Sequence, residues 1–284
     1  SIAYLYGVIG MLAAAMIALR RRSTDTAGAK QITNLTVRVE REDAPRVRDI
    51  EVAHYNRVAF SRVRHGETNP ILVAADDDTL RRDDLVTVVG PADEVARVAD
   101  ELGHPSSHRL VEDRRYLDFR RITLSKPDLA GRTVQDLDLA DRFGATVSRV
   151  RRGDVDMVAT ADLVLQPGDR LRVIAPSGSM DAITKYLGDS TRGLSDINPL
   201  GLAIGMALGV WIGSIHIPLP GGGFELGAAA GTLILGLVFG RVGRVGPVVV
   251  SMPHASATTL SQLGMLVFLA YAGTTAGGLF VDAV

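Results

Sequence analysis

The chain of 284 residues has no cysteine, few aromatic residues and almost no charge in its C-terminal third. The absence of cysteine excludes disulfide bonds, thiolate catalysis and cysteine-based zinc sites. A formal net charge of -1 gives no basic surface of the kind that nucleic-acid binding requires. No Gly-x-Gly-x-x-Gly motif follows a predicted strand, so no dinucleotide is implied and no cofactor is expected.

Charged and apolar residues are segregated along the chain. Hydrophobic residues make up 46% and charged residues 22%, and nearly all the charges lie between Arg20 and Arg192. Residues 198–284 contain only Glu225, Arg241, Arg244 and Asp282 among apolar, glycine-rich runs. That is a membrane composition, so we expect an α-helical membrane protein that also carries charged domains in the cytosol.

The charged region is an internal duplication. Residues 47–52 and 63–66 match 134–139 and 150–153 at a constant offset of 87, and 84–91 match 169–176 at an offset of 85. The copies therefore differ by one surface loop. We predict two tandem α/β domains, at 32–103 and 119–189, with a linker at 104–118.

The second copy shows clear element boundaries. Its pattern predicts a strand at 122–125, an amphipathic helix at 134–143 closed by Gly144, strands at 145–150, 155–158 and 171–175, and a helix at 180–187 closed by Gly188. Pro167 and Gly168 occupy the central positions of a predicted type II turn. In the first copy Arg81-Arg-Asp-Asp84 replaces this turn, which leaves its geometry open.

The first apolar segment, Ile2 to Leu19, is long enough to cross a membrane and ends at Arg20-Arg-Arg22. A signal peptide would carry its positive charge before the apolar run, so we predict a transmembrane helix at 1–22 and a linker at 23–31. The positive-inside rule places the arginines, and the domains after them, in the cytoplasm. Because Ser1 is not an initiator residue, we expect the chain to begin partway through a longer protein.

The C-terminal region, 196–284, predicts about three transmembrane helices, at 200–217, 226–240 and 260–280. Glycines at 201, 205, 209 and 213 form a small-residue face that permits close helix packing. In the last span Thr274 and Thr275 stand among Gly273, Gly277 and Gly278, so polar groups and helix-weakening residues coincide at membrane depth. This stretch is either an unwound part of a substrate pathway or a glycine-rich packing seam.

Other polar clusters favour simple interpretations. Asp76-Asp-Asp78 lacks the alternating ligand spacing of a calcium loop and predicts a solvated loop. His104 and His108 are separated by Pro105, so no metal site is expected there. The basic run of Arg149, Arg151 and Arg152 indicates a solvated strand edge, with an anionic effector as the alternative. No catalytic constellation can be named, so we do not expect an enzyme.

Two resemblances follow from these motifs. Gly131-Arg-Thr-Val-Gln-Asp-Leu-Asp-Leu139, Arg151-Arg-Gly153 and Leu165-Gln-Pro-Gly-Asp-Arg-Leu171 resemble the TrkA-C (RCK_C) domain, and the first copy resembles it less closely. Ile217-Pro-Leu-Pro-Gly-Gly-Gly223, Leu235-Gly-Leu-Val-Phe-Gly-Arg241 and Leu263-Gly-Met-Leu-Val-Phe-Leu-Ala270 resemble the aspartate:alanine exchanger family of the AspT/YidE type. This family implies two membrane halves with two TrkA-C domains between them. The resemblance covers the whole chain but only part of a family member.

The resemblance implies a multi-pass antiporter of the bacterial inner membrane that exchanges small carboxylates or amino acids such as aspartate and alanine. Ser256, Thr274 and Thr275 are the expected hydrogen-bond donors to an anionic substrate, with Gly273, Gly277 and Gly278 allowing close backbone approach. Cytoplasmic TrkA-C domains imply homodimerisation and a possible small-molecule effector. Two alternatives remain open: a regulatory subunit of a ligand-gated cation channel, and a membrane-tethered sensor without transport. No potassium-filter segment occurs, which disfavours the channel itself.

Overall fold

The computed structural model describes residues 31–113, 115–190, 199–219, 222–246 and 248–281, with backbone only at 217–219, 222–225 and 275–281. The chain divides into residues 1–31 and residues 32–284, and the following description concerns the second unit. The transmembrane helix predicted at 1–22 lies outside the described residues.

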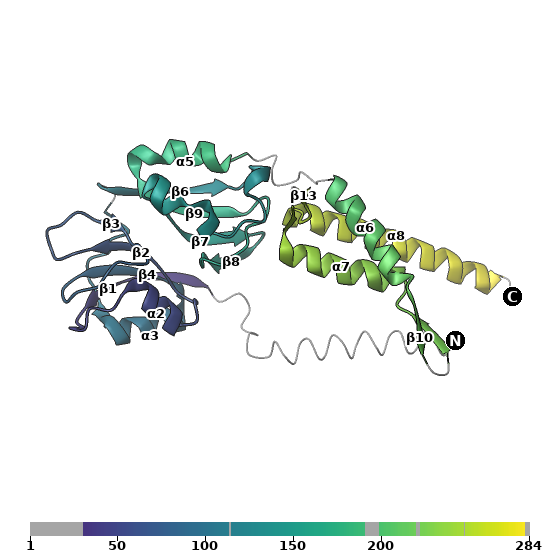
Figure 1. The fold of residues 1–284 in the computed structure, drawn as a ribbon, viewed down its shortest axis with the longest axis horizontal. Helices are drawn as coiled ribbons and strands as arrows, with labels where there is room; N and C mark the ends of the chain where they lie inside the picture. Colours follow the sequence, from purple (N-terminus) through teal and green to yellow (C-terminus); the bar gives the residue numbers. More distant parts are fainter. Residues whose placement is uncertain (1–30, 114, 191–198, 220–221, 247, 282–284) are drawn as a thin grey trace. The chain divides into compact units, whose positions relative to one another are not determined.

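The first repeat folds as an antiparallel sheet with two helices (Figure 1). Its elements are β1 (Ile32–Val39), α2 (Val47–Ala53), β2 (Ala59–Arg64), β3 (Leu72–Val73), β4 (Leu85–Pro91), α3 (Ala92–Leu102) and β5 (Gly103–Pro105). The strand order is β3-β2-β4-β1-β5. One apolar core joins α2 and α3 to the sheet through residues such as Val37, Ile50 and Val98.

The second repeat has the same plan. Its elements are β6 (Leu117–Thr123), the 3-10 turns η1 (Pro127–Leu129) and η2 (Gln135–Leu137), α4 (Leu139–Phe143), β7 (Thr146–Arg152), β8 (Val155–Val158), β9 (Arg170–Pro176), η3 (Ser177–Ser179) and α5 (Met180–Leu187). The order β6-β9-β7-β8 reproduces β1-β4-β2-β3. Each central strand pair is irregular at the same place, between Phe60 and Arg62 in one copy and between Val147 and Arg149 in the other. The duplication therefore extends to a backbone irregularity that the sequence does not reveal.

The helix predicted at 134–143 is wrong as a continuous element. Asp138 has φ +53, and this left-handed residue separates η2 from α4. Leu137 and Leu139 are both buried, at 0% and 5% exposed, although residues two apart on a continuous helix point about 200° apart. The break lets both leucines enter the core, and aspartate tolerates the left-handed conformation. In the first copy α2 continues, and Val52, the equivalent of Leu139, is 60% exposed.

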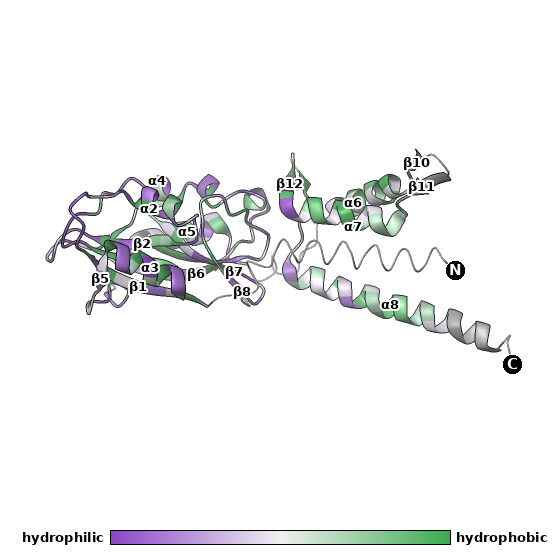
Figure 2. Cartoon of the chain, turned by 90° about the horizontal axis from the view of Figure 1, so that it is seen from below, coloured by the Kyte–Doolittle hydropathy of each residue, from purple (hydrophilic) through white to green (hydrophobic). Residues whose placement is uncertain are grey.

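The C-terminal region contains three apolar helices with short hairpins between them. They are α6 (Pro199–Gly213), α7 (Ala228–Val242) and α8 (His254–Val281), separated by β10 (His216–Leu219) with β11 (Gly222–Glu225), and by β12 (Arg244–Val245) with β13 (Val248–Val249). Figure 2 shows their predominantly hydrophobic colouring. Within the described residues only α8 is long and apolar enough to span a membrane, over His254–Thr274. With 15 residues each, α6 and α7 reach ~22 Å, short of the ~30 Å hydrocarbon core.

These bounds correct the predicted spans. The first ends at Gly213 rather than Ile217, because β10 begins at His216. The last begins at His254, directly after Pro253, rather than at Leu260. Prolines are favoured just before or in the first turn of a helix, where the missing N–H costs nothing.

Helices α6 and α7 pack through the predicted glycine face. A Cβ on Gly209 would lie 2.6 Å from Thr232 Cα, and one on Gly213 would collide with the backbone of Gly227 and Ala228. The Gly227 N–H donates to the Gly213 carbonyl at 2.8 Å. The glycines therefore serve close helix packing, as the four-residue spacing predicted.

Candidate functional site

The residues predicted to bind substrate lie at opposite ends of α8. Ser256 is in its first turn and 7% exposed, whereas Gly273 and Thr274 are exposed near its far end. Eighteen residues of continuous helix separate Ser256 from Thr274, which is about 27 Å. The described chain therefore does not bring these groups into one site.

Of the two alternatives for the stretch around Gly273, the unwound segment is not found, because α8 remains helical from His254 to Val281. Thr274 Oγ1 donates to the Tyr271 carbonyl at 2.9 Å, a local bond that compensates its polarity within the helix. The backbone of Thr275, Gly277 and Gly278 belongs to α8, but their side-chain surroundings lie outside the described residues.

A groove of about 390 Å³ lies at the other end, where α8 begins. It is lined by Gln166 of the second repeat and by residues of α6, α7, the connector before α8 and the start of α8, among them Gly205, Thr232, Ser251 and His254. Ser251 is 6% exposed, and among the described residues its hydroxyl has no hydrogen-bond partner. The N–H groups of Val250 and Ser251 both donate to the Gly243 carbonyl, at 3.1 Å each. The sequence analysis did not select Ser251. A serine two residues before Pro253, which directly precedes α8, could have indicated a polar group near the start of that helix.

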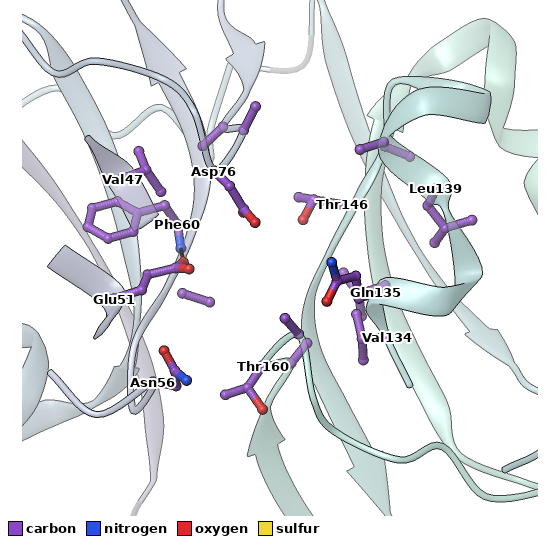
Figure 3. A pocket seen from close by; sticks show the side chains of 18 of the residues that line it. Val47, Glu51, Asn56, Phe60, Asp76, Val134, Gln135, Leu139, Thr146 and Thr160 are labelled. Atoms are coloured by element: carbon purple, nitrogen blue, oxygen red, sulfur yellow. Dashed lines mark hydrogen bonds between the residues drawn. The ribbon is translucent and has the colours of Figure 1, made fainter. Parts of the chain in front are cut away.

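A larger cavity, about 650 Å³, lies between the two repeats (Figure 3). Equivalent positions of the two copies line it: Val47 and Val134, Glu51 and Asp138, Val58 and Ala145, Ala59 and Thr146, and Phe60 and Val147 at the offset of 87, and Ala74 and Ala159, Ala75 and Thr160, and Asp76 and Ala161 at the offset of 85. The duplication thus builds the cavity from two similar surfaces. A volume of this size falls in the range of small-molecule sites.

Glu51 is the most perturbed titratable group of this cavity. Burial raises the pKa of its carboxyl to about 7, and the negative charge of Asp76 adds to the effect. The N–H of Phe60 donates to Glu51 Oε1 at 3.2 Å and opposes the rise. A glutamate that titrates near neutral pH in a cavity is a candidate functional group.

The turns before β4 and β9, which are equivalent strands of the two repeats, each hold a buried carboxylate. Asp169, 1% exposed, accepts from the Gln166 N–H at 2.8 Å, and Asp84, 3% exposed, accepts from the Arg81 N–H at 2.8 Å. Gly168 has φ +85, and the equivalent Asp83 has φ +70. The first copy therefore keeps the turn geometry without the Pro-Gly pair.

The two buried carboxylates have different basic side chains as partners at equivalent positions, an arginine in one copy and a histidine in the other. Arg152 donates to Asp169 through Nε at 2.8 Å and Nη2 at 2.7 Å, whereas His65 Nδ1 lies 2.8 Å from Asp84. The prediction of a solvated edge is therefore wrong for Arg152. It is also wrong for Arg149, whose Nη2 donates to the Ile32 carbonyl at 2.7 Å and whose guanidinium pKa is lowered by burial.

Two regions of the chain match known protein families. A TrkA-C domain matches residues 119–188, and a predicted permease membrane region (Asp-Al_Ex) matches residues 201–284. The chain is 39% identical to the uncharacterized transporter GSU1016 of Geobacter sulfurreducens, over 100% of this chain and 54% of that protein. It is 39% identical to the uncharacterized transporter PPA2034 of Cutibacterium acnes, over 97% of this chain and 53% of that protein. The chain spans about half the length of these curated relatives.

Residues 201–284 belong to the family of predicted permeases (Asp-Al_Ex), and residues 119–188 are a TrkA-C domain, as the motifs predicted. The TrkA-C match covers the second copy, so TrkA-C identity of the first copy remains a prediction that the shared strand order favours. Among solved structures, the RCK C domain of the potassium transport protein KtrA in complex with cyclic diadenosine monophosphate aligns at 20% identity and a TM-score of 0.23, over 24% of this chain and 81% of that chain. That likeness is too low to say more about this chain.

Proposed function

We propose that the chain is part of a secondary antiporter that exchanges small carboxylates or amino acids, such as aspartate and alanine, across the bacterial inner membrane. The observation that carries the proposal is the permease match to residues 201–284, where the structure has helices interrupted by Gly- and Pro-containing connectors. Irregular backbone at membrane depth is compatible with lipid where it lines a cavity. No covalent chemistry is involved.

Substrate contact is proposed at the start of α8. Ser256 lies in the first turn of a 28-residue helix, and the groove beside it contains Ser251. A helix N-terminus favours a carboxylate because its first N–H groups lack helical acceptors and carry partial positive charge. The stretch of Gly273, Thr274, Thr275, Gly277 and Gly278 is then a second polar position on the pathway, about 27 Å away along the helix.

The repeats are proposed to be cytoplasmic, to contribute to a homodimer and to respond to a small-molecule effector in the cavity between them. Their apolar residues outside the core, such as Val52 and Leu72 at 60% and 50% exposed, offer surface for a second subunit. Light scattering of the protein in detergent should show two copies per particle, and a strictly monomeric particle at high concentration would contradict this part.

Counterflow in proteoliposomes tests the transport proposal. Vesicles loaded with an unlabelled amino acid or dicarboxylate should accumulate the labelled external compound, because exchange couples its entry to the exit of the internal one. Protein-free vesicles are the control. Absence of counterflow with every member of a panel of amino acids and dicarboxylates would remove the antiporter assignment.

A further inference from the structure

Every ionisable side chain that lines the cavity between the repeats is acidic. Glu51, Asp76 and Asp77 come from the first repeat, and Asp138 and Asp141 come from the second. No lysine, arginine or histidine occurs among the described residues that form its wall. The negative potential of the cavity is therefore not cancelled from within.

We propose that this cavity binds an organic cation, an amine or polyamine, and that Glu51 is its principal ionic contact. The assignment deepens the proposed regulatory role of the repeats and does not depend on which substrate crosses the membrane. Nucleotides and dicarboxylates are excluded as occupants because their charge has the same sign as that of the wall.

The non-ionic part of the wall fits such a ligand. Val47, Phe60, Val134 and Leu139 supply apolar surface for methylene groups. The labelled amides and hydroxyls in Figure 3, those of Asn56, Gln135, Thr146 and Thr160, supply neutral hydrogen-bonding groups from both sides. A wall that combines apolar surface with several polar groups and one perturbed acid fits a small-molecule site.

Glu51 is placed to respond to a cation. Its carboxyl is half-buried, and the Phe60 N–H supplies a single backbone hydrogen bond. The titratable groups that face it from the other elements around the cavity are Asp76, Asp77, Asp138 and Asp141, so neutralisation has to come from a proton or a ligand. Burial holds its pKa at about 7, so a bound ammonium group would displace that proton.

An organic cation suits the cavity better than a metal ion. Within the described parts of the chain, no group of three or more His, Cys, Asp or Glu side chains is arranged to hold a metal. The carboxylates come from both repeats and line a cavity of about 650 Å³, a volume that an extended polyamine can fill and a single ion cannot.

Calorimetric titration of the whole protein in detergent with spermidine tests the proposal. We expect saturable binding at about pH 8, and weaker binding at about pH 6, where Glu51 is protonated. Glu51→Gln keeps the shape of the side chain and should lower the affinity at least about tenfold, the value of one charge-assisted hydrogen bond. Glu112→Gln is the matched control, because Glu112 is 72% exposed, pairs with Arg109 and lies outside the cavity.

Spermidine binding that is lost in Glu51→Gln and kept in Glu112→Gln supports the assignment. Absence of spermidine binding, equal affinity in Glu51→Gln, or equally tight binding of ATP overturns it. Thermal unfolding of both variants shows whether each is folded. Counterflow measured without spermidine reports the transport proposal separately, so either proposal can fail alone.

Discussion

Arg152→Ala should be among the most destabilising changes outside the apolar cores. The Arg152 guanidinium gives Asp169 two charge-assisted hydrogen bonds, at 2.8 and 2.7 Å, and its Nη2 also donates to the Val164 carbonyl at 2.8 Å. Without Arg152, the Asp169 carboxylate, which is 1% exposed, keeps its hydrogen bond from the Gln166 N–H but loses its cationic partner. Removing one partner of a buried ion pair costs about 3–5 kcal/mol, because the remaining charge stays buried and uncompensated.

The expected shift is large enough for a simple assay. At about 2–4 °C per kcal/mol for a chain of this size, the Tm should fall by about 6–20 °C in thermal unfolding followed by circular dichroism. Arg151→Ala is the matched control: the neighbouring Arg151 lies 3.7 Å from Asp154 in an exposed pair, which contributes about 0–1 kcal/mol. The double variant Arg152→Ala, Asp169→Asn should recover part of the loss, since it removes the unpaired charge.

Equal Tm values for Arg152→Ala and Arg151→Ala would refute this reasoning. They would mean that Asp169 reaches water or another cation once Arg152 is shortened. A double variant that is as unstable as Arg152→Ala would instead assign the loss to the Val164 hydrogen bond and to packing.

Four further predictions concern the cavity, the helices and the topology. Glu51→Gln should flatten the pH dependence of stability. The carboxyl ionises near pH 4.5 in the unfolded chain and near pH 7 in the folded one, so the free energy of unfolding decreases by about 3 kcal/mol at most as the pH rises from the first value to the second. If denaturant titrations give the variant the same change of unfolding free energy with pH, the raised pKa is contradicted. Gly209→Leu should reduce folded protein on size-exclusion chromatography, because its Cβ meets Thr232 Cα at 2.6 Å, whereas Gly236→Leu, with open space around it, should not. Thr274→Val should weaken apparent substrate affinity several-fold if its hydroxyl contacts substrate, at ~1 kcal/mol per lost hydrogen bond, and unchanged exchange kinetics would remove it from the site. A cysteine introduced at Asp77 should react with an impermeant reagent only in permeabilised cells, and labelling of intact cells would reverse the topology.

Sequence reasoning succeeded where a local rule decides the structure. The repeat, the strands at 155–158 and 171–175, the Gly144 and Gly188 helix ends and the close glycine packing of α6 and α7 each follow from spacing or from a glycine at a required position. The same local rules explain one error. They predicted one helix over 134–143, because a period of 3.6 fits most of its apolar residues, but the core requires both Leu137 and Leu139 and breaks the helix between them.

What the sequence could not indicate is how groups far apart in the chain combine. Arg152 looks like part of a basic surface run until Asp169, 17 positions later, is placed against it. Glu51 looks like an ordinary helix-surface acid until the fold places it in the wall of a cavity, where burial raises the pKa of its carboxyl. In both cases the charge is visible in the sequence, but its effect depends on burial, which the fold creates.

The duplication offers a way around this limit, because equivalent positions can be compared within one chain. His65 and Arg152 occupy equivalent positions and both meet a buried aspartate, so exchanging them tests whether the turn requires a permanent cation or only a donor. A folded Arg152→His variant whose Tm falls as the pH rises above the ordinary histidine range would show that the second turn requires the charge, whereas a pH-independent Tm would show that a neutral donor suffices.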